Sequence, residues 1–187
     1  MTALLVAIFA FQLNASMLSP ALTTMERELH TSSDQIGLTQ TVFFTAAALF
    51  SLFLPRLADL VGRKKVLLGI LVATTLGCVV SALAPNVTVL MLGRILQGAA
   101  GPVVPMCLIM LHVRITEEKR YTKLMAILTS VNGGIAGVDA LLGGWLAGTF
   151  GLRSVFWTMA AIALVALLPV FLAAAASTAA AQPEMAW

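Results

Sequence analysis

Six long apolar runs constrain the fold of this chain more than any other feature of its sequence. An α-helix rises about 1.5 Å per residue, so about 20 apolar residues cross the ~30 Å hydrocarbon layer of a bilayer. Of the 187 residues, 60% are hydrophobic and only 10% are charged, a composition typical of membrane proteins. A backbone in lipid must satisfy its own hydrogen bonds, as a helix does. The sequence therefore predicts six transmembrane helices, at residues 3–22, 35–55, 66–84, 87–111, 123–148 and 154–176.

The links between these runs are short, and the one at residues 85–86 is only a Pro-Asn pair. Short links hold consecutive helices side by side in one bundle. In the first link, Ser32 precedes Gln35 by three residues, the spacing of a capping box, which predicts the start of the second helix there. The expected fold class is thus an all-α polytopic membrane protein, with one domain over residues 1–187 and a short tail at 177–187.

The Lys and Arg residues predict how the bundle is oriented, because they collect in the cytoplasmic loops of membrane proteins. Eight of the eleven basic residues lie on one side of the bundle, in the links after the second and fourth runs. Only Arg27 and Arg153 lie on the other side, and Arg94 falls inside a run. Both termini are therefore expected in the cytoplasm and the bundle in a bacterial plasma (inner) membrane. The other eight basic residues follow the second and fourth runs: Arg56, Arg63, Lys64, Lys65, Arg114, Lys119, Arg120 and Lys123.

Aligned with itself at an offset of 89 positions, the chain shows an internal repeat. The turn LADLVGRKKVL (57–67) then matches LAGTFGLRSVF (146–156), and helices 1–3 (about 3–84) lie over helices 4–6 (about 87–176). Three spans per copy make the two copies cross in opposite directions, an inverted 3+3 repeat typical of secondary transporters. The alternative is chance similarity between two glycine-containing turns.

Three motifs resemble signatures of the major facilitator superfamily. LADLVGRKKVLL (57–68) resembles the family's cytoplasmic turn between helices 2 and 3. LGRILQGAAG (92–101) is similar to its helix 4 motif, and GVDALLGGWLAG (137–148) to the helix 5 motif of its proton-driven efflux members. The resemblance covers nearly the whole chain. It implies one half-bundle of a proton-coupled transporter of drugs or metabolites, which rocks against a second half around a central site.

The chain departs from the family pattern at three places. Pro55 stands where the first motif usually opens with glycine, and Asn14 stands where many drug–proton antiporters have an acid. In the helix 5 motif, Asp139 and Ala140 replace the Gly-Pro pair. These departures weaken the narrower assignment to drug antiporters.

The turn between helices 2 and 3 is the expected conformational gate, carried by Asp59, Gly62, Arg63 and Lys64. Glycine permits the abrupt reversal, and Asp59 can pair with Arg63 or with the positive end of another helix. The resemblance implies that this contact reaches the second half and holds one conformer closed. A solvated turn is the alternative.

Arg94 and Asp139 are charged residues deep within the runs. A charge at the bilayer centre costs about 2.5–3.5 kcal/mol, so each needs a partner or a water-filled cavity. By the helical rise, they lie roughly 10 Å and 13 Å below the outer ends of their helices. We expect them to interact, and Asp139 to change protonation or partner during transport. A static pair, or an Arg94 that snorkels to the interface, is the alternative.

Polar and small residues lie on the same helix faces as Arg94 and Asp139, at spacings of three, four or seven residues. Small residues permit close helix packing, and polar residues face a cavity or one another. Phe43, Phe44, Phe50 and Phe53 are assigned to packing or lipid contact rather than to a drug-binding wall. For the polar residues of the first run, the alternatives are substrate binding and interhelical hydrogen bonds; these residues are Gln12, Asn14, Ser16 and Ser19. The candidate substrate or proton pathway is Asn14, Arg94, Gln97, Asn132 and Asp139, and the candidate helix-packing glycines are Gly98, Gly101, Gly143 and Gly144.

The sequence gives no reason to expect an enzyme, a metal or a cofactor. It contains neither a Gly-x-Ser-x-Gly nor a His-Glu-x-x-His motif, and no basic stripe that would bind nucleic acid. The expected partners are the bilayer, a small solute, protons and a second six-helix half, supplied by another chain, a missing segment or a second copy. A non-transporting membrane scaffold or regulatory subunit is the alternative.

Overall fold

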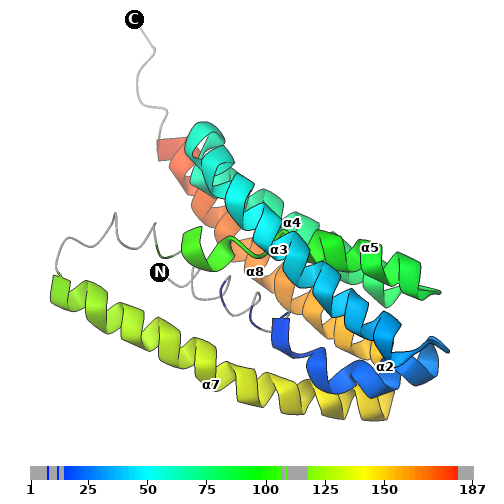
Figure 1. Cartoon of the computed structure of the whole chain (residues 1–187). Helices are drawn as coiled ribbons and strands as arrows, with labels where there is room; N and C mark the ends of the chain where they lie inside the picture. The colour runs from blue at the N-terminus through cyan, green and yellow to red at the C-terminus, as the bar shows by residue number, and fades with distance from the viewer. Residues whose placement is uncertain (1–7, 9–11, 13–14, 107, 109–117, 181–187) are drawn as a thin grey trace, which may run out of the picture.

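A computed structural model describes residues 8, 12, 15–106, 108 and 118–180, and every regular element within them is helical (Figure 1). This confirms the all-α fold class. The predicted helices at 35–55, 66–84, 123–148 and 154–176 are all present, each with slightly different ends. The elements are the 3-10 helix η1 (Ser19–Ala21) and the α-helices α2 (Leu22–Glu28), α3 (Ser33–Val61), α4 (Arg63–Ala82), α5 (Val87–Gly98), α7 (Glu118–Phe150) and α8 (Leu152–Ala180).

Two of the predicted spans, the first and the fourth, are interrupted by turns in the structure. In the first, the chain is helical at residues 15–16, turns at 17–18 and continues as η1 and α2. In the fourth, α5 ends at Gly98, and after a turn at 99–102 the chain is helical again at 103–106. Pro102 lies in this turn, where its missing backbone N–H interrupts the helical hydrogen-bond pattern, and Pro105 lies in the helical stretch that follows.

The helix starts follow local hydrogen bonding. The Ser32 side chain accepts a hydrogen bond from the backbone N–H of Gln35 at 3.4 Å, which confirms the predicted cap. At the start of α5, the Asn86 side chain accepts from the N–H of Val89 at 3.0 Å. Each cap satisfies one of the N–H groups that a helix start leaves without a partner.

Helix α4 occupies the middle of the bundle and packs against both α8 and α5, while α3 packs against α5. Helix α7 runs along the other side, where it contacts η1 and α8 (Figure 1). At the offset of 89 residues, α4 corresponds to α8 and α3 to α7. The packing of α4 on α8 therefore joins two helices that the offset makes equivalent.

The turns that join these helices support the same repeat. Gly62 lies between α3 and α4 with a φ of 109°, and Gly151 lies between α7 and α8 with a φ of 81°. They are the glycines with positive φ among the described residues, and they are 89 positions apart. Glycine adopts this conformation without the steric penalty of a Cβ. A shared backbone device at equivalent turns favours the repeat over chance similarity.

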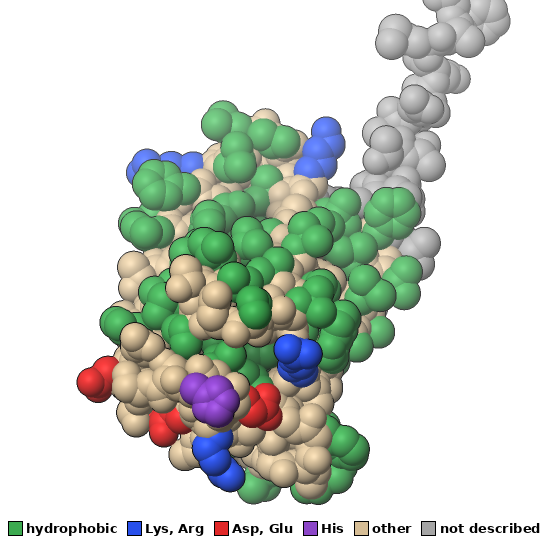
Figure 2. All heavy atoms as spheres, turned by 90° about the vertical axis from the view of Figure 1, so that its right-hand side faces the viewer, with side chains coloured by type: hydrophobic (Ala, Val, Ile, Leu, Met, Phe, Trp, Pro, Cys, Tyr) green, Lys and Arg blue, Asp and Glu red, His purple; other side chains and the backbone are tan. Residues whose placement is uncertain are grey.

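Apolar side chains cover the outside of the bundle as well as its interior. Leu52, Leu60 and Leu141 are among the large hydrophobic residues that are exposed. Figure 2 shows hydrophobic side chains across the middle of one face, with most charged side chains toward its two ends. By length and composition, three helices among the described residues can cross a membrane, namely Ser33–Val61, Lys65–Ala82 and Val87–Met106, and Leu152–Leu168 is a shorter apolar helix. This distribution is that of an integral membrane protein.

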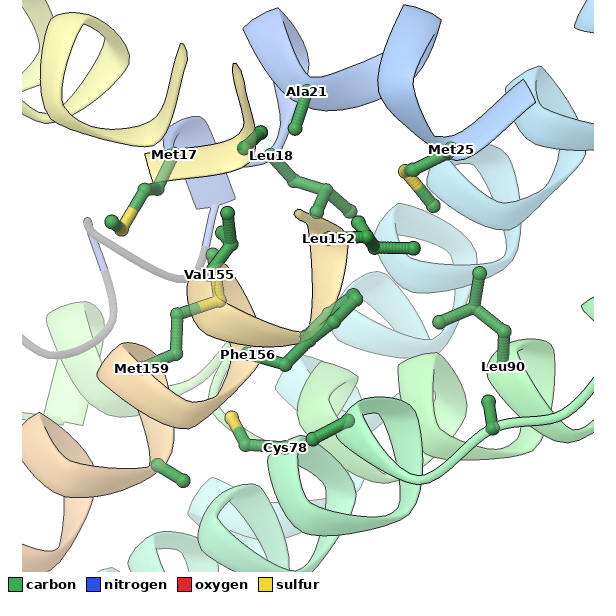
Figure 3. Packing of buried hydrophobic residues seen from close by; sticks show 14 of the residues in the cluster. Met17, Leu18, Ala21, Met25, Cys78, Leu90, Leu152, Val155, Phe156 and Met159 are labelled. Atoms are coloured by element: carbon green, nitrogen blue, oxygen red, sulfur yellow. The ribbon is translucent and has the colours of Figure 1, made fainter. Parts of the chain in front are cut away.

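One buried cluster fixes the end of the bundle where α2 meets α8. Phe156 of α8 lies at its centre, with Cys78 of α4, Leu90 of α5 and Met25 of α2 around it (Figure 3). Each of these side chains is fully buried. The cluster also includes Ile36 of α3 and Ala147 of α7, so it joins all the helices that carry the polar residues described next.

Candidate substrate and proton pathway

Arg94 lies on α5 and is completely buried. Its Nη1 donates to Gln97 Oε1 at 2.6 Å, and its Nη2 donates to Gln40 Oε1 of α3 at 2.7 Å. The guanidinium carbon lies 4.2 Å from the centre of the Phe43 ring. Two amide oxygens accept from the guanidinium and an aromatic face lies against it, so the buried cation has both hydrogen-bonding and cation–π partners.

The two glutamines extend this contact to neighbouring helices. Gln97 Nε2 donates to Ser81 Oγ of α4 at 2.9 Å. Gln40 Nε2 donates to the backbone carbonyl of Ala15 in the first segment at 3.3 Å. The hydrogen-bonded chain from Ser81 to Ala15, which we call the arginine network, therefore joins α4, α5, α3 and the first segment.

Asp139 lies on α7 and is 1% exposed, which makes it the buried carboxyl group among the described residues. Ser16 Oγ donates to its Oδ2. The other oxygen, Oδ1, is buried and has no hydrogen-bond partner in the described part of the chain. Ser16 Oγ also lies 2.8 Å from the backbone carbonyl of Gln12, one helical turn earlier. The carboxyl group thus contacts the first segment at the residue that follows Ala15.

Both charged residues are buried, as expected, but they do not form the expected pair. Among the described residues, the ion pair is Asp59–Arg63. Helix α7 packs against η1 and α8 rather than against α5, which carries Arg94. The two groups are instead connected indirectly, because Gln40 binds the carbonyl of Ala15 and the next residue binds Asp139.

Three of the four predicted packing glycines lie at close backbone contacts. A Cβ on Gly98 would lie 2.5 Å from the Cβ of Ala46, and one on Gly101 would lie 2.5 Å from the carbonyl oxygen of Ala47. A Cβ on Gly143 would overlap the carbonyl oxygen of Met17. Gly144 differs, because its added Cβ would lie 3.4 Å from the nearest atom, an ordinary contact.

The turn between α3 and α4 brings Asp59 and Arg63 together. Arg63 Nη2 and Nε donate to Asp59 Oδ1 at 3.0 Å and 3.2 Å. The Asp59 side chain is 63% exposed and the Arg63 side chain 35% exposed, so this is a surface ion pair of the ordinary, weakly stabilising kind. The side chain of Lys64 lies outside the described residues. So do Asn14 and, within α7, the side chain of Asn132.

Several residues of this site were not singled out from the sequence. Gln40 and Ser81 are polar residues within apolar helices. A polar residue in such a run usually faces the interior of the bundle, and this rule could have identified both residues from the sequence. Phe43 is buried as a packing residue, but it also lies against Arg94, whereas Phe44 and Phe53 are exposed. Gly77 of α4 is another close contact, since its added Cβ would lie 2.7 Å from the carbonyl oxygen of Gly93.

An apolar helical bundle with charged ends and a buried polar interior defines an integral membrane protein of the polytopic α-helical class. The family model of the Major Facilitator Superfamily matches residues 4–185. The chain therefore belongs to the Major Facilitator Superfamily of transporters, as the three sequence motifs indicated.

The chain is 67% identical over all 187 of its residues to the uridine/deoxyuridine transporter of Lactococcus lactis subsp. cremoris, and it spans 39% of that protein. It is 30% identical over 148 residues (79% of this chain, 32% of the relative) to the inner membrane transport protein YajR of Escherichia coli. It is 32% identical over 135 residues (72% of this chain, 33% of the relative) to the multidrug resistance protein MdtG of Dickeya zeae. The chain thus spans between about a third and two fifths of these curated relatives.

Proposed function

We propose that the chain forms one six-helix half of a secondary transporter for pyrimidine nucleosides. The observation that carries the proposal is the 67% identity, along the whole chain, to a uridine/deoxyuridine transporter. The relative named for multidrug resistance is 32% identical over a shorter stretch. A nucleoside is therefore the better supported solute within the broader class of small organic solutes and drugs.

The buried polar residues suit such a solute. Nucleosides are neutral and offer hydroxyl, carbonyl and N–H groups, which amides and carboxylates bind by hydrogen bonds. Gln97 and Asp139 are buried polar residues on different helices of the bundle. With Asn14 and Asn132, they form the pathway we propose, while Arg94 holds the glutamines in place.

We assign the coupling proton to Asp139. It is the buried carboxyl group of the described chain, and a membrane-embedded carboxyl group is a usual element of proton relays. In this proposal the bundle lies in a bacterial plasma membrane with both termini in the cytoplasm. A second six-helix half completes the pathway, and the Asp59–Arg63 turn docks against it in one conformer.

Uptake of radiolabelled uridine into proteoliposomes tests this function. The chain is reconstituted alone and together with the part of the Lactococcus relative that it does not span, with and without an imposed proton gradient. We expect uptake in the combined sample only, stimulation by the gradient, and competition by deoxyuridine but not by a cationic drug. Absence of uptake from a correctly assembled combined sample contradicts the proposal and favours the membrane-scaffold alternative.

A further inference from the structure

The Ser16 hydroxyl has one proton and two acceptors within reach. Its oxygen contacts Asp139 Oδ2 on α7 and lies 2.8 Å from the carbonyl oxygen of Gln12 in its own segment. Gln12 Nε2 also donates to the same hydroxyl oxygen, at 3.4 Å. Because a hydroxyl carries a single proton, it can donate to only one of the two acceptors at a time.

The protonation state of Asp139 decides between the two donations. An ionised carboxylate only accepts hydrogen bonds, so it requires the Ser16 proton and leaves the Gln12 carbonyl without it. A protonated carboxyl group donates to the Ser16 oxygen instead, and the hydroxyl then turns to the Gln12 carbonyl. Both arrangements use the same three oxygens, and they differ in which segment the Ser16 proton faces.

We propose that Ser16 is a positioning residue that couples protonation of Asp139 to the first segment of the chain. This inference rests on the transport function proposed above and gives Ser16, a polar residue of the first run, a role in proton coupling. When Asp139 is ionised, the hydroxyl ties α7 to the first segment through a charge-assisted hydrogen bond, the stronger kind. When Asp139 is protonated, the hydroxyl bonds within its own segment and the charge that held α7 is gone.

The proton balance of this cycle is simple. One proton enters from one side of the membrane and binds Oδ2 of Asp139, and the same proton leaves from that atom to the other side. The Ser16 hydroxyl keeps its own proton throughout and only rotates. No bond other than the carboxyl O–H forms or breaks.

Few charged groups compete for Asp139 from the elements that pack against α7. Helix α8 carries Arg153 as its titratable residue, near its first turn, and η1 carries none. The other titratable residues of α7 all fall within 118–123, at the far end of that helix. The described residues 12 and 15–18 of the first segment include none. Ser16 is thus the hydrogen-bonding partner that the described structure gives to this carboxyl group.

The position of Ser16 gives the switch a route to Arg94. Ser16 follows Ala15, whose carbonyl accepts from Gln40, and Gln40 accepts from Arg94. A movement of the first segment relative to α7 therefore changes a contact of the arginine network as well. This arrangement replaces a direct pair of Arg94 and Asp139 with a coupling through the backbone between them.

Substitutions at Ser16 test the proposal in the combined transporter described above. Ser16→Ala removes the hydroxyl, Ser16→Thr retains it, and Asp139→Asn removes the titrating group. Ser51→Ala is the matched control, because Ser51 is equally half-buried and its Oγ donates to the carbonyl of Ala47 at 2.7 Å, with no carboxylate nearby in the described contacts. We expect Ser16→Ala to lower the stimulation of uptake by the proton gradient about tenfold, the factor for one hydrogen bond to a charged group. Ser16→Thr restores it and Ser51→Ala leaves it unchanged.

Infrared difference spectroscopy on the same samples gives a readout that does not need transport. The carboxyl band of Asp139 is identified by its loss in Asp139→Asn, and it should shift in Ser16→Ala but not in Ser51→Ala. If unsubstituted protein takes up no uridine, the proposed function fails, and the band still tests the contact. If uridine uptake is normal and neither the band nor the gradient stimulation changes in Ser16→Ala, the role of Ser16 is overturned.

Discussion

Replacement of Gln40 by leucine should remove the connection between Arg94 and the first segment. Leucine has a similar volume but offers no acceptor for the Nη2 of Arg94, now 2.7 Å from Gln40 Oε1. Hydrogen bonds to charged groups contribute about 1.5–3 kcal/mol, while interhelical bonds in membranes average about 0.6 kcal/mol and reach about 1.7 kcal/mol. Because Arg94 is completely buried, we expect a value near the top of the membrane range, a loss of about 1.5 kcal/mol.

Reversible unfolding in mixed detergent micelles measures this loss as a change of about tenfold in the folding equilibrium. The matched control is Gln35→Leu, at an exposed position near the start of the same helix, where we expect a change below about 0.5 kcal/mol. A double-mutant cycle with Arg94→Met isolates the contact. In that background Gln40→Leu should cost little, because its charged partner is gone. Equal losses in both backgrounds would show that the contact between Gln40 and Arg94 contributes nothing to stability.

Three further substitutions test the structure elsewhere. Gly98→Val should destabilise the chain by at least 2 kcal/mol, roughly the cost of overpacking a helix contact, whereas Gly144→Ala, with space for a methyl group, should change the unfolding midpoint little. Glu28→Gln should weaken the start of α8, where Glu28 Oε1 accepts from the N–H of Leu152 at 2.9 Å. We expect a loss of about 0.5–1 kcal/mol and faster hydrogen exchange at that amide, and unchanged exchange would show that the charge of Glu28 contributes nothing to this cap. Asp59→Asn removes a surface pair worth about 0.3–0.5 kcal/mol, so stability should hardly change. A concurrent large loss of uridine uptake would then indicate the gating role, and normal uptake would argue against it.

The sequence alone predicted the helices well where length and composition decide them. The runs at 35–55 and 66–84 became α3 and α4 because a membrane leaves little alternative to a helix for 20 apolar residues. The start of α3 was also predictable, since Ser32 and Gln35 are adjacent in the chain. The interruption after Gly98 was not predicted, because prolines occur within membrane helices without ending them.

The polar site was predicted in its members but not in its contacts. Position within an apolar run follows from counting residues, so Arg94 and Asp139 were correctly expected to be buried. Which helices face each other does not follow from depth, and α7 packs against η1 rather than α5. Gln40 was missed because a single polar residue in an apolar run shows no partner in the sequence, and its role depends on α3 packing against α5.

The repeat accounts for which helices pair but not for the residues that make the contacts. Under the offset of 89, the packing of α3 on α5 corresponds to that of α7 on η1 at the end of the first segment. In the first pair, the close approach comes from Gly98 on the fourth helix; in the second, it comes from Gly143 on the fifth. The buried charged residues differ between the two interfaces as well. Arg94 lies in the interface of α3 with α5, and Asp139 lies in the interface of α7 with the first segment. The link from Gln40 to Ala15 joins the two interfaces. Helices that the offset makes equivalent thus carry different polar residues, and we expect a change at one interface to reach the other through the hydrogen bond between Gln40 and Ala15.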